Sequence, residues 1–302
     1  MKLLPMLATA AAPLDGPEYS FEVKWDGVRA LAAVEPSGWS MWGRGGVDYT
    51  ARYPELAVLG RLPPGTVVDG ELVVLRQGRA DFPALLRRHQ RCRPLPAGYQ
   101  AAAVTYLLFD LLYERGRALL QETLTRRRAA LRALVETMQE PLLVYSDGVV
   151  GAGRAFFAQA VAQGHEGVMA KRNDSAYRPG RRSPAWRKIK PTELLPCVVI
   201  GYRAHGDGVA CLLVATVRQG ALRYVGRLTS GWGADAGREL ARRLAGIRRR
   251  TRPVVACPRG ACWVEPELYC RVRCQGWTSQ ERLRHGVFAG LLDQPNHQDR
   301  GG

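Results

Sequence analysis

The 302-residue sequence contains no apolar run that approaches the roughly 20 residues needed by a membrane-spanning helix. Acidic residues are also in deficit, because 27 Asp and Glu face 44 Lys and Arg, which gives a formal net charge of +17. The positive charge favours a polyanionic partner, nucleic acid before an anionic membrane surface. A GC-rich genome, whose codons inflate Arg, Ala and Gly, also explains the charge. Charge alone therefore does not identify the partner.

Cysteine pairs with the usual spacing of zinc ligands are missing as well. Cys257, Cys262, Cys270 and Cys274 lie close together, but neither pair is Cys-x2-Cys. The segment LYCRVRC instead predicts a strand in which Cys270, Val272 and Cys274 share one face. The odd total of seven cysteines, without a convincing secretory signal, indicates reduced thiols in a cytoplasmic protein.

Up to about residue 190, strand-like and helical segments alternate. Three runs rich in β-branched and aromatic residues, YSFEVKW, TVVDGELVVL and AVTYLLFDLLY, predict strands. Residues 123–138 have apolar positions at helical spacing and predict a helix with Thr123 as its N-cap and a basic outer face. Residues 154–167 predict a second helix that ends near Gly164.

Prolines punctuate the sequence between residues 179 and 196, and we expect a linker near residues 190–195. Beyond the linker lie several strand-like runs, CVVIGYRA, GVACLLVATV, LRYVGRL and CWVEPELYCRVRC, with one helical segment over residues 234–247. This number of short strands with a single helix is typical of a small barrel of the oligonucleotide-binding (OB) type.

Lys24 lies in the stretch EVKWDGVRA, among two carboxylates and an arginine. The pattern Lys-x-Asp-Gly arises by chance in roughly one of twenty chains of this length, so it is weak alone. Further short motifs follow it in order. They are DGELVV with Glu71, LLFDLL with Phe109 and Asp110, HEGVMAKR with Glu166 and Lys171, and AWRKIK with Lys188 and Lys190.

These ordered motifs resemble the covalent nucleotidyltransferase superfamily and, within it, the ATP-dependent DNA ligases. The likeness runs from PMLA near the start to RHGVFAG near the end, and includes GRGGVDYTARYPEL and CQGWTSQERLRHGVFAG. It is strongest to two-domain bacterial ligases that occur as the ligase module of end-joining enzymes or as stand-alone paralogues. The resemblance implies an α+β protein: a nucleotidyltransferase (ATP-grasp-like) adenylation domain with antiparallel sheets over residues 1–191, then a β-barrel OB-fold domain over residues 192–302.

The resemblance also implies roles for the matching residues. Lys24 would form a lysyl-AMP intermediate, because a neutral lysine amine can attack phosphorus and neighbouring cations disfavour its ammonium form. Glu166 would bind Mg²⁺ or Mn²⁺, since hard cations prefer carboxylates, together with Asp26 or Asp110. The other implied contacts are Lys188 and Lys190 at the α-phosphate, Glu22 and Phe109 at the adenine, Arg29 and Glu71 at the ribose, Arg44 at the 5′-phosphate of the nick, and Lys171 and Arg284 elsewhere in the nucleotide site.

Each of these residues also has a plainer structural explanation. Taken singly, Glu71 or Glu166 is more commonly a solvated charge, and Phe109 in an apolar strand is usually part of a core. Lys188 and Lys190 alternate and fit one basic face of a strand. The order of the motifs, not any one residue, therefore indicates the chemistry.

The C-terminal motif departs from the family pattern. RHGVFAGLLDQ keeps Arg284 and Gly290, but Gly286 stands where Pro is usual and Leu292 where a second Arg is usual. In the family that Arg orients the β- and γ-phosphates as the leaving group. Its replacement by Leu292 predicts slow adenylylation of the lysine but leaves nucleotide binding intact.

The function that these features favour is sealing of 3′-OH/5′-phosphate nicks in DNA repair or end joining, with ATP and Mg²⁺ (or Mn²⁺) as cofactors. Two alternatives stay open: an RNA ligase or capping-type guanylyltransferase of the same superfamily, and a non-catalytic nucleic-acid-binding homologue, which Leu292 supports. The expected partners are nicked duplex DNA, ATP and end-joining or repair proteins. We expect a cytoplasmic monomer without membrane contact.

Overall fold

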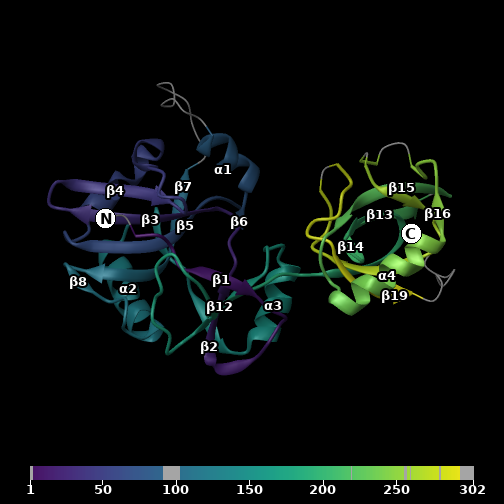
Figure 1. The fold of residues 1–302 in the computed structure, drawn as a ribbon. Helices are drawn as coiled ribbons and strands as arrows, with labels where there is room; N and C mark the ends of the chain where they lie inside the picture. Colours follow the sequence, from purple (N-terminus) through teal and green to yellow (C-terminus); the bar gives the residue numbers. More distant parts are fainter. Residues whose placement is uncertain are drawn as a thin grey trace. The chain divides into compact units, whose positions relative to one another are not determined.

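The computed structural model describes residues 3–90, 103–218, 220–254, 257–258, 260–278 and 280–292. The chain separates into two compact units, residues 1–190 and residues 191–302 (Figure 1). No helix within the described ranges is long and apolar enough to cross a membrane.

The larger sheet of the first unit has the strand order β4-β3-β5-β7-β8, with β6 paired to β5 and β9 paired to β7. Its neighbours pair antiparallel, except that β9 runs parallel to β7. The strands are β3 (Val28–Glu35), β4 (Gly38–Gly43), β5 (Thr66–Arg76), β6 (Arg79–Ala80), β7 (Val104–Glu114), β8 (Arg117–Ala118) and β9 (Leu143–Tyr145).

Both faces of this larger sheet are buried, which explains its long apolar runs. Along β3, Ala30, Ala32 and Val34 pack into one hydrophobic cluster. Leu31 points to the opposite face and packs into a second cluster, which also contains Trp186 of the other sheet. The second cluster therefore joins the two sheets, and the pocket described below lies beside it.

The smaller sheet has the order β1-β12-β11-β2-β10, in which only β1 and β12 are parallel. Its strands are β1 (Leu7–Ala10), β2 (Gly16–Val23), β10 (Gly148–Gly151), β11 (Val168–Arg172) and β12 (Arg182–Ile189). The predicted strands YSFEVKW, TVVDGELVVL and AVTYLLFDLLY are confirmed as β2, β5 and β7, although β2 ends at Val23, before Lys24.

Helices cover the outer faces of the two sheets. They are α1 (Phe82–His89), α2 (Leu124–Met138) and α3 (Gly153–Ala162), with 3₁₀ turns η1 (Thr50–Arg52) and η2 (Pro54–Arg61). The helix α2 packs against β7 and β9, whereas α3 packs against β2 (Figure 1).

The predicted ends of two helices are confirmed. The Thr123 hydroxyl accepts a hydrogen bond from the Arg126 N–H at 3.3 Å, and α2 begins at the next residue after Thr123. Helix α3 ends before Gly164, whose φ of +81° suits glycine. The basic outer face predicted for α2 is partly wrong, because Arg127 and Arg128 are buried.

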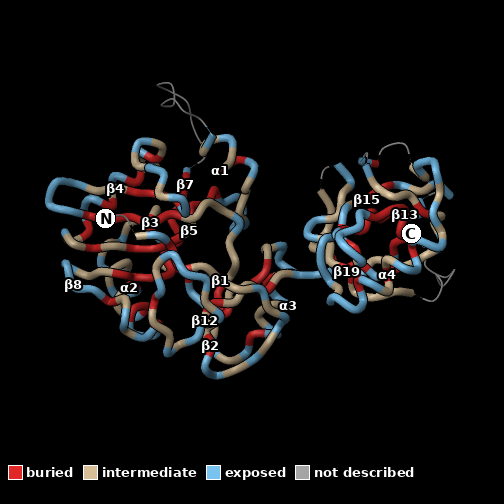
Figure 2. Tube along the Cα trace, in the orientation of Figure 1, coloured by how far each residue is buried: buried red, intermediate tan, exposed pale blue. Residues whose placement is uncertain are grey.

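The second unit is a curled antiparallel sheet around its own core. Strand β13 pairs with β18 along its first half and with β14 and β17 along its second half. Figure 2 shows buried residues along these strands and exposed residues at the turns. The elements are β13 (Glu193–His205), β14 (Gly208–Arg218), β15 (Ala221–Leu228), α4 (Ala234–Gly246), β16 (Arg248–Arg249), β17 (Cys262–Val264), β18 (Tyr269–Cys274) and β19 (Val287–Leu292).

The segment CWVEPELYCRVRC forms two strands instead of one. Pro266 lies in a turn, closed by a 2.8 Å hydrogen bond from the Glu267 N–H to the Glu265 carbonyl. After this turn, β18 buries Cys270, Val272 and Cys274 on one face, as predicted. In the described residues, no group of three His, Cys, Asp or Glu side chains is arranged to hold a metal ion.

Candidate nucleotide-binding site

A pocket in the first unit collects residues from both of its sheets. Eight of the thirteen predicted site residues line it. The lining consists of Leu7, Ala8, Glu22, Val23, Lys24, Trp25, Arg29, Arg44, Glu71, Phe109, Met169, Lys171, Arg182, Trp186 and Lys188.

Lys24 is fixed by backbone contacts just after β2. Its N–H donates to the Gly167 carbonyl at 2.9 Å, and Gly167 has a φ of +138° and no room for a Cβ beside the Ile189 carbonyl. A Cβ on Gly27 would lie 2.2 Å from the Leu72 carbonyl oxygen. The glycines of the Lys-x-Asp-Gly and Glu-Gly motifs therefore let the backbone approach closely and place Lys24 at the pocket.

Glu166 bridges two lysines beside the pocket. One carboxylate oxygen contacts Lys24 Nζ and the other contacts Lys190 Nζ. Burial alone would raise the pKa of Glu166, but the charges and hydrogen bonds of Lys24 and Lys190 outweigh it and hold this pKa below its usual value. Burial and the charges of Lys190 and Arg182 lower the pKa of Lys188. Two lysines of the predicted cationic cluster, Lys24 and Lys190, thus meet at one carboxylate, and Lys188 lines the pocket beside Lys24.

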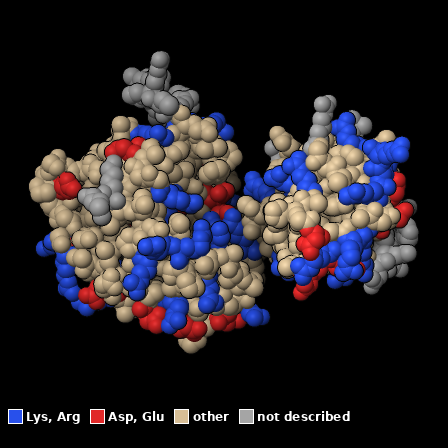
Figure 3. Space-filling model, in the orientation of Figure 1, with Lys and Arg blue, Asp and Glu red and all other residues tan. Residues whose placement is uncertain are grey.

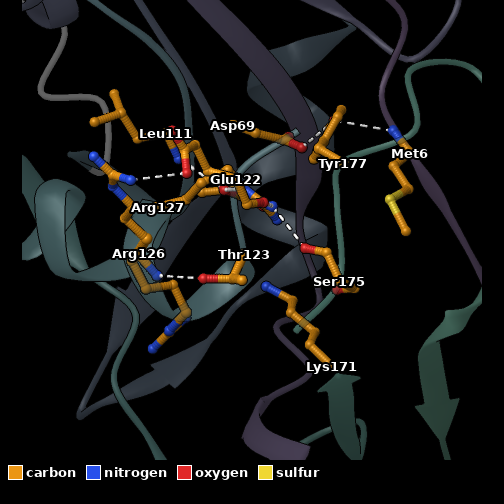
Figure 4. A network of polar contacts seen from close by, with 12 residues as sticks. Met6, Asp69, Leu111, Glu122, Thr123, Arg126, Arg127, Lys171, Ser175 and Tyr177 are labelled. Carbon is orange, nitrogen blue, oxygen red and sulfur yellow. Dashed lines mark hydrogen bonds and ion pairs between the residues drawn. The ribbon is translucent and has the colours of Figure 1, made fainter. Parts of the chain in front are cut away.

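Arg29 and Glu71 are cross-strand partners on β3 and β5. The Arg29 Nε donates to Asp69 Oδ1 at 2.9 Å, and the Tyr177 hydroxyl donates to Asp69 Oδ2 at 2.6 Å. The Met6 N–H in turn donates to the Tyr177 oxygen at 2.9 Å, as Figure 4 shows. Asp69 and Tyr177 are buried, and their hydrogen bonds hold the Arg29 side chain in position. Only Asp69 belongs to a motif singled out in the sequence; Tyr177 carries no such signal.

Among the carboxyl groups that line the pocket, Glu71 has a pKa that departs strongly from its usual value. Burial raises its pKa to about 7, although the charges of Arg29 and Lys24 lower it. Near neutral pH this group therefore exists in both its neutral and its ionised form. Only the ionised carboxylate is purely a hydrogen-bond acceptor.

An aromatic wall closes the inner side of the pocket. Phe109 and Trp186 meet edge to face, with ring centroids 6.1 Å apart. The Lys171 ammonium lies 4.1 Å from the Phe109 centroid and 4.5 Å from the Trp186 centroid, and it pairs with Glu22 at 2.8 Å. Burial lowers the pKa of Lys171 in spite of Glu22. The second oxygen of Glu22 contacts Arg128, which the sequence did not single out.

Asp110 is not among the residues that line this pocket, and its role as a metal ligand stays a prediction. Its side chain is fully buried, and Arg127 donates to both carboxylate oxygens, from Nε at 2.7 Å and from Nη2 at 2.9 Å. Arg127 Nη1 also donates to the Glu122 and Ser175 carbonyls (Figure 4). Both oxygens of Asp110 thus serve a structural ion pair.

Asp26 and Arg284 have different positions. Asp26 is exposed after Trp25 and does not line the pocket. Arg284 is an exposed residue of the second unit, and its backbone pairs with Gln275 and Gly276. The roles of both residues stay predictions. Glu166 fits a Mg²⁺ site, because Mg²⁺ is commonly held by one or two carboxylates together with phosphate oxygens of the substrate.

Comparisons with known families cover both units. Residues 5–190 match the model of the ATP dependent DNA ligase domain, and residues 205–294 match the model of the ATP dependent DNA ligase C terminal region. The chain is 35% identical over 303 residues to the multifunctional non-homologous end joining DNA repair protein LigD of Mycobacterium tuberculosis, which covers 96% of this chain and 38% of that protein. It is 33% identical over 314 residues to LigD of Pseudomonas aeruginosa, covering 99% of this chain and 36% of that protein.

The chain thus spans less than two fifths of the length of these curated relatives. A solved structure of mycobacterial DNA ligase D complexed with ATP and MES is similar, with a TM-score of 0.57, 33% identity, and coverage of 97% of this chain and 96% of that one. The predicted nucleotidyltransferase fold with an OB-type second domain is confirmed by this similarity.

Proposed function

Because the chain belongs to the family of ATP-dependent DNA ligases, we propose that it seals 3′-OH/5′-phosphate nicks in duplex DNA through a lysyl-AMP intermediate. The observation that carries this proposal is the position of Lys24, which lines a pocket shared with Lys188 and lies in contact with Glu166. A nucleophilic amine, cationic partners for phosphate and a metal-binding carboxylate are thus gathered at one place.

In the first step, Lys24 must leave Glu166 and lose a proton before its Nζ attacks the α-phosphorus of ATP. The N–P bond forms, the bond from the α-phosphorus to the bridging oxygen breaks, and pyrophosphate leaves. Lys188 and Lys190 would neutralise charge on the α-phosphate. Bound Mg²⁺, held by Glu166, would supply further charge neutralisation at the phosphates.

The adenosine part of the substrate would occupy the inner side of the pocket. Phe109 offers an aromatic wall for the adenine, whereas Arg29 and the ionised form of Glu71 offer a donor and an acceptor to the ribose hydroxyls. Asp69 and Tyr177 would act by holding Arg29 in place.

The later steps transfer AMP to the 5′-phosphate of the nick and then join the 3′-OH to that phosphate, with release of AMP. Arg44 is an exposed residue at the pocket mouth, and its guanidinium suits a terminal phosphate. Figure 3 shows lysine and arginine gathered across the visible face of the first unit, which supports a nucleic-acid substrate. The names of the relatives support a place in end-joining repair.

Intact mass after incubation with ATP and Mg²⁺ tests the proposal. The wild-type protein should gain the mass of AMP, and Lys24→Ala should not. Lys188→Ala keeps the nucleophile and should form the same adduct more slowly. An adduct on Lys24→Ala would place the nucleophile elsewhere, and no adduct on the wild type would support a non-catalytic homologue. Sealing of nicked DNA and of nicked RNA would separate a DNA ligase from an RNA ligase.

A further inference from the structure

A second pocket of about 330 Å³ lies in the first unit, formed by β12 and the segment that follows β11. It shares no lining residue with the nucleotide pocket. Its lining consists of Arg172, Asp174, Ser175, Ala176, Arg178, Ser183, Pro184, Ala185 and Arg187.

The two pockets use opposite faces of β12. Arg182, Trp186 and Lys188 line the nucleotide pocket, whereas Ser183 and Arg187 line the second pocket. Alternation of side chains along a strand accounts for these five positions, whereas Pro184 lines the second pocket outside that alternation.

The second pocket carries excess positive charge. Three arginines and one aspartate line it, which leaves two positive charges. The Arg172 guanidinium forms a bidentate ion pair with Asp174, in which Nε lies 3.1 Å from Oδ1 and Nη2 lies 2.7 Å from Oδ2. Arg178 is exposed and makes no ion pair among the residues that the structure describes.

Arg187 is held in a defined position without a carboxylate. Its Nε donates to the Pro184 carbonyl at 3.2 Å, and its guanidinium carbon lies 4.9 Å from the centroid of the Tyr19 ring. These two contacts leave its terminal nitrogens available to a ligand. The Ser183 oxygen accepts from the Ala185 N–H at 3.2 Å, so its own hydrogen remains a donor.

We propose that this second pocket binds a phosphate group, through the forks of Arg178 and Arg187 and the hydroxyl of Ser183. Guanidinium forks and a hydroxyl donor match the oxygens of a phosphate, and two uncompensated charges match its negative charge. The phosphate can come from a nucleic-acid backbone or from free pyrophosphate. Both sources present non-bridging phosphate oxygens, which accept hydrogen bonds from the pocket.

The test compares the wild type with Arg178→Gln/Arg187→Gln, which removes two charges from the second pocket. The control is Arg115→Gln/Arg154→Gln, which removes two charges from residues outside both pockets. Arg178→Glu, which alters only an exposed side chain, serves if the double variant does not fold.

The first measurement is affinity for nicked duplex DNA over a series of KCl concentrations. If the pocket binds a backbone phosphate, the slope of log affinity against log salt should fall by about 0.9 for each phosphate that the variant no longer neutralises, beyond any change in the control. The second measurement is calorimetric titration with pyrophosphate. If the pocket takes a free anion, the wild type and the control should show two binding events and the pocket variant only one.

Either result supports the phosphate site and identifies its source. A pocket variant that matches the control in both measurements would overturn it. Formation of lysyl-AMP should be unchanged in the pocket variant, because the two pockets have no residue in common. This readout, and the titration with pyrophosphate, separate failure of the second pocket from failure of the proposed ligase activity.

Discussion

Arg127 of α2 holds both carboxylate oxygens of Asp110 in the interior of the first unit, where both side chains are fully buried. The next residue of the helix, Arg128, contacts Glu22 on the other sheet. Two consecutive arginines thus connect one helix to β7 of the larger sheet and β2 of the smaller one. Of the four paired residues, Glu22 lines the nucleotide pocket.

Replacing Arg127 should strongly destabilise the first unit. Arg127→Met leaves the buried Asp110 carboxylate without its ion-pair partner and with only the hydrogen bond from the Leu111 N–H, a change that costs about 3–5 kcal/mol of unfolding free energy. Arg126→Met is the matched control, because Arg126 is exposed and pairs at the surface with Glu122, where about 0.2–1 kcal/mol is expected. Urea unfolding measures both.

The loss of stability in Arg127→Met should also depend on pH. Burial raises the pKa of Asp110 even with Arg127 present, so ionisation of this group opposes folding. Without Arg127, ionisation of Asp110 disfavours folding more strongly. The variant should therefore be less destabilised at pH 5, where Asp110 is more readily protonated, than at pH 8. Equal destabilisation in the two arginine variants, or destabilisation independent of pH, would show that the buried pair contributes little.

Nucleotide affinity should rise with pH around neutrality. Burial raises the pKa of Glu71 to about 7, and in the proposed site its ionised form accepts a ribose hydroxyl. ATP affinity should therefore increase from pH 6 to pH 8, whereas folding stability should decrease from about pH 4.5 to about pH 7, because the folded-state pKa exceeds the usual 4.5. In Glu71→Gln both trends should weaken. Titration with a fluorescent ATP analogue measures the affinity, and an identical pH profile in the variant would remove Glu71 from the ribose site.

Glu166→Gln should increase the Mg²⁺ concentration needed for lysyl-AMP formation. Removal of one charged ligand, worth roughly 1.5 kcal/mol, corresponds to about a tenfold change. The initial rate of adduct formation over a Mg²⁺ series is the measurement. Glu18 is an exposed carboxylate on β2, and Glu18→Gln should leave the dependence of the adduct-formation rate on Mg²⁺ concentration unchanged. An unchanged curve for Glu166→Gln would mean that Glu166 only pairs the two lysines.

Leu292→Arg should accelerate the first chemical step alone. Leu292 lies on β19, opposite Tyr269 of β18. The family resemblance implies an arginine for the leaving pyrophosphate at this position. Restoring one charge-assisted contact, worth roughly 1.5–3 kcal/mol, should speed adenylylation about ten- to a hundredfold.

Sealing of a pre-adenylylated nick releases no pyrophosphate and should change little in this variant. Single-turnover rates of both steps decide the matter. A similar gain in both steps would point to improved DNA binding or folding, and no gain in the first would show that Leu292 is not at the leaving-group position.

The sequence predicted the features that depend on short-range patterns. Runs rich in β-branched and aromatic residues located β5 and β7, the Thr123 cap located the start of α2, and the ordered motifs located eight residues that line one pocket. The sequence did not predict the position of side chains whose burial depends on a partner far away in the chain. Three consecutive arginines, 126–128, look equivalent in sequence, but only the packing of α2 against the sheets decides which of them point inward. Asp110 follows Phe109 in a ligase-like motif, and its partner lies 17 residues away on a helix.

The alternation of β12 between two pockets makes its spacing more critical than its composition. A substitution at Arg187 alters one side of the strand and leaves Lys188 where it is. If Lys188 keeps its place, deletion of one residue between Ser183 and Lys188 would reverse the residues before the deletion, so that Arg182 would face away from the nucleotide pocket and Ser183 would face it. In a population of variants, the exposed positions of this segment should therefore accept single replacements more readily than the segment accepts a change in length.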